Sequence, residues 1–317
     1  MATTRLSEQD VTRFLGEQFD HIGDVVLLAS GAWSSAFAFR SAGRELVAKF
    51  GRYPEDYAKD LEASAWARSN LPIPAVLAVG EAFDGACVLS ERRFGDSLAD
   101  VSPDRFRAVL EALFDALVAM REIDVPGRGF GMWQAPGGGA PFASWAEYLN
   151  AAADRNEDRL PGWRRGLADH AGAREVFDRS IPVLERLTAG LPDRRQVIHA
   201  DLLNNILVSR DNRLTAVFDW GNSLAGDPLY DVAWLAYCAP WYPGLDPNDV
   251  MRLARERFDE PGLEQRVACY ELHISVDSMQ YHAFTGRSDE LEAAMRRTAT
   301  LLDRLESPWR RKQIPWP

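Results

Sequence analysis

Long apolar runs are missing from this sequence of 317 residues. None approaches the roughly 20 residues that a helix needs to cross a bilayer. The first ten residues are polar and carry acidic side chains, so they lack the apolar stretch of a signal peptide. Cysteine is scarce, and Cys87, Cys238 and Cys269 are widely spaced, odd in number and set among apolar residues. We therefore expect no membrane partner, and buried free thiols in a reducing cytoplasm.

Basic side chains are also scarce relative to acidic ones: the sequence has 36 Lys and Arg and 47 Asp and Glu, which gives a net charge of −11. An acidic surface argues against a nucleic acid as partner and suits a cationic small molecule, although it suits ordinary solubility equally well. Internal repeats and low-complexity tracts are not evident. The length and the apolar content of 46% are typical of a globular protein with two lobes, each with its own core.

The residues that could take part in catalysis or metal binding are concentrated at 199–205, which reads His-Ala-Asp-Leu-Leu-Asn-Asn. Two apolar runs follow, at 206–208 and 214–218, and a polar turn separates them. Short β-rich runs around such a turn predict a hairpin. The hairpin would hold Asp201 just before its first strand and Asp219 just after its second.

This arrangement suits a magnesium-assisted phosphoryl transfer. Asp201 can orient a substrate hydroxyl and accept its proton. Magnesium prefers oxygen ligands, which Asn205 and Asp219 can supply, and the phosphates of a nucleotide can complete its shell. Each residue alone is more simply a turn or cap residue. The ordered set between two apolar strands favours phosphoryl transfer.

The same residues resemble the catalytic loop and metal motif of the aminoglycoside phosphotransferases, a family with a protein-kinase-like fold. The family pattern is His-Gly/Ala-Asp, a few residues, an Asn, and then a hydrophobic residue followed by Asp-Trp/Phe. Similar passages at 11–15, 71–74 and 277–281 extend the resemblance over most of the chain. It implies an α+β fold of two lobes: a small β-rich nucleotide-binding lobe at 1–91 and a mostly helical catalytic and substrate-binding lobe at 92–317.

The resemblance also implies a reaction, the transfer of the γ-phosphate of ATP or GTP to a hydroxyl of an aminoglycoside. The acceptor would be a cationic antibiotic, with hygromycin B as the first expectation. Asp201 would act as base and contact the acceptor, and Asp277 matches an Asp of family members that phosphorylate hygromycin B. Two alternatives stay open: a kinase of another small alcohol, such as an amino alcohol or sugar, and a nucleotide-binding regulator without catalysis.

The sequence departs from the family pattern at the metal-binding Asn. That residue usually follows the catalytic Asp by five positions, where this chain has Ile206. A loop shorter by one residue would let Asn205 serve, with Asn204 shaping the tightened turn in left-handed geometry. Alternatively, Asn204 is itself the ligand.

The resemblance places the nucleotide contacts in the N-terminal third of the chain. A small-residue turn that includes Ser34 lies between two predicted strands and could close over phosphates, although it lacks the three glycines of protein kinases. Lys49, in a predicted strand at 45–50, resembles the lysine that contacts nucleotide phosphates. Ser90 and Arg92 flank the expected linker between the lobes, where backbone groups would meet a purine.

In the kinase fold, that lysine pairs with an acid on the next helix, which we predict from about 57 to 69. Asp60 fits the family register, whereas Glu62 fits the residue type. Two residues on a helix differ by about 200° around its axis, so the two acids cannot share a face. The sequence leaves this choice open.

Apolar periodicity predicts most of the remaining elements. Asp227 before Pro228 is expected to cap a helix, and Asp231 resembles a family residue that braces the catalytic loop. For Glu271 and Asp277 the simplest interpretation is a solvated helix face. A glycine- and proline-rich loop is expected at 125–141. The predicted strands are at 25–28, 37–39, 76–81 and 87–90, and the predicted helices at 6–19, 103–121, 142–156, 174–189, 247–258, 263–285 and 288–306.

Overall fold

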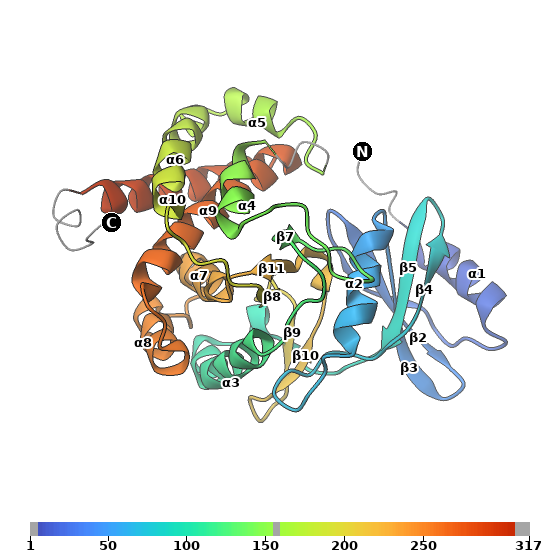
Figure 1. Ribbon diagram of the computed structural model, residues 1–317. Coiled ribbons are helices and arrows are strands. Elements are labelled where there is room, and N and C mark those ends of the chain that lie inside the picture. The colour runs from blue at the N-terminus through green and yellow to red at the C-terminus, as the bar shows by residue number, and fades with distance from the viewer. Residues whose placement is uncertain (1–5, 155–158, 308–317) are drawn as a thin grey trace. The chain divides into compact units, whose positions relative to one another are not determined.

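The computed structural model describes residues 6–154 and 159–307 (Figure 1). Contacts divide this part of the chain into two compact units. The first contains the described residues up to Ala119, together with Gln134–Gly139 and Asp201–Ser223. The second contains Met120–Trp133, Ala140–Ala200 and the described residues from Leu224 onward. The lobe boundary between 91 and 92 stays a prediction. Among the described helices, none has the length and apolar character required to span a membrane.

The first unit is built on an antiparallel five-stranded sheet with the strand order β1-β2-β3-β5-β4. Its strands are β1 (Val26–Ser30), β2 (Ser34–Ser41), β3 (Arg44–Gly51), β4 (Val76–Ala82) and β5 (Gly85–Glu91). The register pairs Ala36 with Lys49 and Lys49 with Val88, so β3 is a central strand and Lys49 is no edge residue. The predicted strands in this region are therefore confirmed.

Two helices cover the two faces of this sheet (Figure 1). Helix α1 (Glu8–Gln18) packs Val11 and Leu15 against the face that carries Phe50. Helix α2 (Pro54–Ser64) packs Tyr57 against the opposite face, which carries Val88. Because side chains alternate along a strand, Lys49 projects from the α2 face.

The starts of these helices follow from local chemistry. The Ser7 hydroxyl accepts the Asp10 N–H while the Asp10 carboxylate accepts the Ser7 N–H, a capping box that starts α1. Helix α2 begins at Pro54, three residues before the predicted start, because proline is pre-organised for the first helical position. It ends at Ser64 rather than 69, and a short turn leads to the predicted Leu71-Pro72 passage.

The predicted hairpin is present. Strands β9 (Ile206–Val208) and β10 (Leu214–Val217) pair antiparallel, and β6 (Asp96–Ser97) extends the sheet beside β9. The Phe218 N–H donates to the Asn205 carbonyl at 3.1 Å, which closes the open end of the hairpin. Asn205 and Asp219 are thereby brought to the same end. A 3-10 turn, η3 (Trp220–Asn222), follows at once.

The second unit is mostly helical. A small sheet with the order β7-β11-β8 (Gly131–Met132, Leu224–Gly226, Gln196–Ile198) precedes helix α7 (Leu229–Cys238). Helix α9 (Leu263–Thr285) is buried on nearly all sides, because α5, α6, α7 and α10 pack around it. The other helices are α4 (Trp145–Asn150), α5 (Trp163–Asp169), α6 (Ala173–Thr188), α8 (Pro247–Phe258) and α10 (Ser288–Glu306).

Several long helices match their predicted ranges closely, namely α3 (Pro103–Arg121), α8, α9 and α10. The helix predicted at 142–156 is shorter: Ser144 caps α4, and a 3-10 turn (Ala151–Ala153) follows it. The last two predicted residues lie outside the described part of the chain. Helix α5 and strand β7 were not predicted, since both are too short to show a period.

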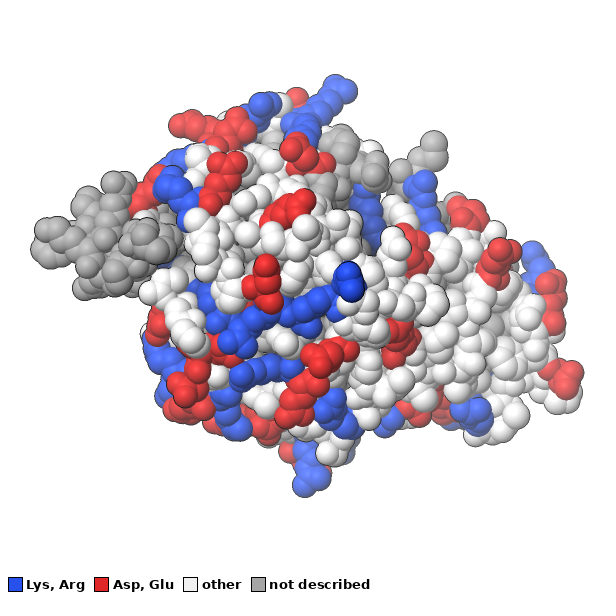
Figure 2. All heavy atoms as spheres, viewed as in Figure 1, with Lys and Arg blue, Asp and Glu red and all other residues white. Residues whose placement is uncertain are grey.

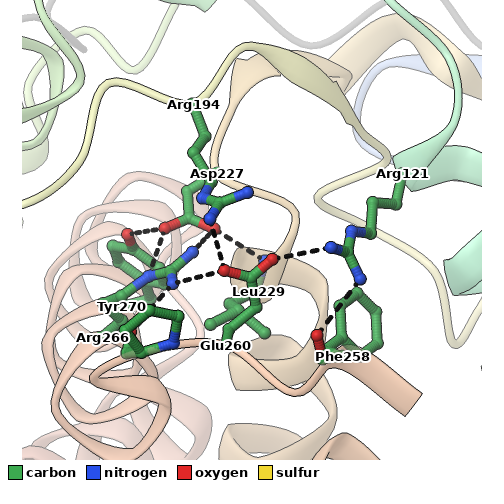
Figure 3. A network of polar contacts seen from close by, with 9 residues as sticks. Arg121, Arg194, Asp227, Leu229, Phe258, Glu260, Arg266 and Tyr270 are labelled. Atoms are coloured by element: carbon green, nitrogen blue, oxygen red, sulfur yellow. Dashed lines mark hydrogen bonds and ion pairs between the residues drawn. The ribbon is translucent and has the colours of Figure 1, made fainter.

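A buried network of charges fixes the start of α7 to α9 (Figure 3). Asp227 is fully buried and accepts two hydrogen bonds from Arg266 and one from the Tyr270 hydroxyl. It also accepts the Leu229 N–H at 3.1 Å, which is the predicted capping contact, although Pro228 precedes the helix instead of opening it. Buried charges require such partners. Arg121, Arg194 and Arg266 surround the second acid of the network, the carboxylate of Glu260.

One predicted surface residue proves to be internal. Glu271 is only 5% exposed, and its carboxylate forms ion pairs with Arg297 at 2.8 Å and Arg304 at 2.7 Å. The prediction of a solvated face for Glu271 is therefore wrong: its partners come from α10, so it joins α9 to α10. The three cysteines are free, as predicted, and Cys87 and Cys269 are buried whereas Cys238 is half-buried.

Candidate active site

Asp231 on α7 fixes the backbone between β8 and the predicted catalytic loop. Asp231 on α7 accepts the N–H groups of His199 and Ala200, each at 2.8 Å. These residues immediately precede Asp201, so Asp231 braces the loop as the family resemblance implied. Ala200 adopts left-handed backbone geometry with φ of 61°, which is uncommon without glycine and is held by this contact. Burial raises the pKa of Asp231 to about 7, against the effect of its two N–H donors.

Asp201 lies where the hairpin begins. Burial first, and then the Asp219 carboxylate, raise the pKa of Asp201 to about 7. The Asn205 amide donates to the Asp201 carbonyl at 2.6 Å, and the Asn222 amide approaches the Asp201 carboxylate at 3.4 Å. A carboxyl whose pKa lies near neutrality is suited to exchange a proton with a substrate hydroxyl.

The turn between Asp201 and Asn205 shows how the shortened loop is accommodated. The Asn205 N–H donates to the Leu202 carbonyl at 2.8 Å, so residues 202–205 form a hydrogen-bonded turn. Asn205 is buried, whereas Asn204 is exposed. The left-handed residue, however, is Ala200 and not Asn204, so the predicted backbone role of Asn204 is wrong.

Asp219 pairs with Lys49. The Lys49 ammonium lies 2.6 Å from the Asp219 carboxylate, and both belong to the first unit. Burial acts to lower the pKa of Lys49, but the carboxylates of Asp219 and Asp60 outweigh it and raise that pKa. Asp219 itself has left-handed geometry, with φ of 65° and ψ of 66°.

The choice between Asp60 and Glu62 follows from their surroundings. Asp60 is buried on α2 and accepts the Trp220 N–H at 2.7 Å. Burial raises the pKa of Asp60 to about 6, and the nearby Lys49 ammonium counteracts that rise. Glu62 instead accepts the Gly137 N–H, and burial raises its pKa as well. Of the two candidates, Asp60 is therefore the one within electrostatic reach of the lysine, and Asp56 of the same helix adds to its effect.

The predicted nucleotide contacts other than Arg92 share one face of the sheet. Ser34 lies two residues before Ala36, the partner of Lys49, and Ser90 pairs with Val47, two residues before Lys49. The period of two along a strand then places Ser34, Lys49 and Ser90 on the same face.

Arg92 follows the end of β5. Its guanidinium binds Glu45 at 3.1 Å and lies 4.9 Å from the centre of the Phe94 ring. The nucleotide roles of Ser34, Ser90 and Arg92 stay predictions.

The donor set fits a magnesium ion that also binds nucleotide phosphates. Since the Asn205 amide nitrogen is used on the Asp201 carbonyl, its oxygen is the atom left for a cation. The Asp201 and Asp219 carboxylates repel each other, which a divalent cation would relieve. Within residues 6–154 and 159–307, no cluster of three His, Cys, Asp or Glu could hold a metal by itself. Magnesium at phosphate-transfer sites typically uses one or two carboxylates, substrate phosphates and water.

Comparison with known proteins identifies the family. The profile of the phosphotransferase enzyme family matches residues 24–268, which is more than half of the chain. The chain belongs to this family. As a member, it is a small-molecule O-phosphotransferase with a protein-kinase-like fold, which confirms the predicted fold class and the predicted class of enzyme.

Among similar phosphotransferases, hygromycin-B 4-O-kinase from Escherichia coli is 28% identical over 293 residues, covering 92% of this chain and 84% of that protein. A thermostable mutant of aminoglycoside phosphotransferase APH(4)-Ia, solved with ADP and hygromycin B, is 28% identical with a TM-score of 0.82. The match covers 94% of this chain and 99% of that one. A second mutant, solved with AMP-PNP and hygromycin B, is 27% identical with the same TM-score and coverage.

The predicted substrate ligand of this phosphotransferase belongs to the second unit. Asp277, on α9, lies 3.6 Å from the buried ring nitrogen Nδ1 of His273, and its side chain is 29% exposed. The Tyr230 hydroxyl lies 2.9 Å from the same nitrogen. Asp277 is thus neither fully solvated nor enclosed. Its contact with an acceptor stays a prediction.

Proposed function

We propose that this phosphotransferase transfers the γ-phosphate of ATP or GTP to a hydroxyl group of an aminoglycoside, with hygromycin B as the first candidate acceptor. The observation that carries the proposal is the convergence of Asp201, Asn205, Asp219 and Lys49 in one unit. Two similar solved structures contain a nucleotide together with hygromycin B, which supports the same pair of ligands here.

In this proposal Asp201 orients the acceptor hydroxyl and takes its proton as the oxygen attacks the γ-phosphate. The bond from the γ-phosphorus to the β-phosphate oxygen breaks, and ADP or GDP leaves. A pKa near neutrality lets Asp201 do both. Lys49 leaves Asp219 to contact the phosphates. Asp219 and Asn205 would then hold magnesium, which would neutralise charge on the phosphate oxygens. Ser34 and Ser90 of the proposed lobe at 1–91 contribute nucleotide contacts, together with Arg92, which directly follows that lobe.

The acceptor is proposed from charge as well as from relatives. A net charge of −11 favours the approach of a polycationic ligand. Figure 2 shows acidic and basic side chains interspersed on the face it presents, so the excess of acid is not gathered into one patch there. Asp277 is the proposed acidic contact of the acceptor in the lobe at 92–317. Because the reaction consumes ATP or GTP, we propose the cytoplasm as its location.

A nucleotide-consumption screen tests the proposal. Purified protein is incubated with ATP or GTP, magnesium and one acceptor at a time: hygromycin B, other aminoglycosides, amino alcohols and sugars. We expect consumption above background with hygromycin B, and strongly reduced consumption for the Asp201→Asn variant. Turnover restricted to amino alcohols or sugars would instead identify a kinase of another small alcohol.

A further inference from the structure

A second lysine of the first unit has no place in the proposed chemistry. Lysine occurs only at positions 49, 59 and 312 of the sequence. Lys59, on α2, is 2% exposed. Its ammonium donates to the Gly221 carbonyl at 2.9 Å and to the Ser223 carbonyl at 3.0 Å. Burying an ammonium is costly unless acceptors meet it, so this placement needs a reason.

Asp60, the next residue of α2, binds the same turn, residues 220–223, as a hydrogen-bond acceptor rather than as a donor. Asp60 accepts the Trp220 N–H at 2.7 Å, while Lys59 donates to the carbonyls of Gly221 and Ser223. Two consecutive helix residues thus bind three of the four residues that follow Asp219. Both the donors and the acceptors of this turn are engaged by α2.

Packing brings the turn into direct contact with the helix. A Cβ atom on Gly221 would lie 2.8 Å from the Cβ of Asp56, closer than such atoms approach in proteins. The Trp220 ring meets the Trp66 ring edge-on, with centroids 5.7 Å apart. The turn therefore has no room to move toward α2, and its hydrogen bonds keep it from moving away.

Asp219 is the residue that this attachment controls. It precedes the turn directly and has left-handed backbone geometry, which is uncommon for residues other than glycine although Asp adopts it more readily than most. A magnesium shell requires ligand distances near 2.1 Å, so a small shift of the Asp219 backbone would weaken it.

We propose that Lys59 is a positioning residue: by holding residues 221–223 against α2, it fixes the Asp219 carboxylate for the magnesium–nucleotide. The inference rests on the proposed function for the role of Asp219. Lys59 does not touch the reacting groups, so its loss should act through metal-dependent nucleotide binding.

The test compares Lys59→Met, which removes the ammonium and keeps a long side chain, with wild type. Leu61→Ala is the matched control, because Leu61 lies on the same helix and is 46% exposed. Nucleotide binding is titrated by calorimetry with ADP, with and without magnesium. Amide hydrogen exchange of residues 219–223 is measured on the protein without nucleotide or metal.

For Lys59→Met we expect faster exchange across 219–223 and an affinity for ADP in magnesium weaker by about tenfold. Affinity for ADP without magnesium should change little, which separates positioning from a general loss of structure. Leu61→Ala should match wild type in all three measurements. A folded Lys59→Met with wild-type exchange and wild-type magnesium dependence would overturn the proposal, as would equal weakening with and without magnesium.

If Lys59→Met does not fold, Gly221→Ala provides the test instead. Its added methyl group pushes the turn away from α2 while Lys59 is unchanged. The same loss of magnesium-dependent affinity is expected, and its absence would overturn the proposal. Because these measurements use ADP and no acceptor, they can still be interpreted if no aminoglycoside is phosphorylated. That result would remove the proposed function and leave the role of Lys59 standing.

Discussion

Asp231 offers a sharp test of how the loop before Asp201 is held. Its carboxyl group is buried and meets two backbone N–H donors, those of His199 and Ala200. Burial favours the protonated form, whereas the two donors favour the carboxylate. Burial prevails and raises the pKa of Asp231 to about 7. Asp231→Asn replaces the carboxyl by a neutral group of the same shape.

The sign of the pH effect follows from this pKa. An unfolded Asp has a pKa of about 3.9. Between about pH 4 and 7 the folded wild type therefore binds a proton that the unfolded chain releases, so its free energy of unfolding falls as pH rises. The span between the two pKa values corresponds to at most about 4 kcal/mol. Asp231→Asn lacks this titration, so the variant gains stability relative to wild type over the same range.

Urea unfolding of both proteins at pH 5, 6, 7 and 8 measures the difference. Asp169→Asn is the control, because Asp169 lies in the same unit with a side chain 72% exposed. Its difference from wild type should be small and nearly constant. If wild type instead gained stability over Asp231→Asn as pH rises, the two N–H donors would outweigh burial and the reasoning would be refuted.

Three further predictions concern the proposed metal and phosphate contacts. Asp219→Ala should abolish magnesium-dependent nucleotide binding, and an unchanged magnesium dependence in a binding titration would count against the metal assignment. Lys49→Ala should lower kcat/KM by about 10²-fold with a smaller effect on folding; lost stability with unchanged activity per folded molecule would make Lys49 structural. Asn205→Ala should raise the magnesium concentration for half activity while Asn204→Gly is mild, and the reverse order would make Asn204 the ligand.

Local sequence was sufficient where the signal was local. The periods of α3, α8 and α10 reproduce the helix ranges because each helix runs over three or more turns with an apolar stripe. Helix α9 also matches its predicted range, although it is buried on nearly all sides and has no such stripe. The hairpin that carries Asn205 and Asp219 was readable for a similar reason, since two apolar runs flank a polar turn. Strand β7 and helix α5 were not predicted, because elements of two and seven residues are too short to show a period.

Residues whose role depends on distant partners could not be assigned from the sequence. Lys59 meets Gly221, 162 positions further along the chain. Glu271 looked like a surface acid until Arg297 and Arg304 of α10 were placed beside it. For the same reason, only tertiary contacts separate Asp60 from Glu62. A lysine or an acid on an otherwise apolar helix face is the one local sign of such a partner.

The central claim is that Asp201 promotes phosphoryl transfer to an aminoglycoside. The most direct measurement follows labelled γ-phosphate from ATP or GTP to hygromycin B, with wild type and Asp201→Asn compared at equal nucleotide saturation. We predict labelled hygromycin B with wild type and a kcat lower by about 10²–10⁴-fold with Asp201→Asn, the usual contribution of general-base catalysis. Equal rates for the two proteins, or no label on any aminoglycoside, would contradict the account.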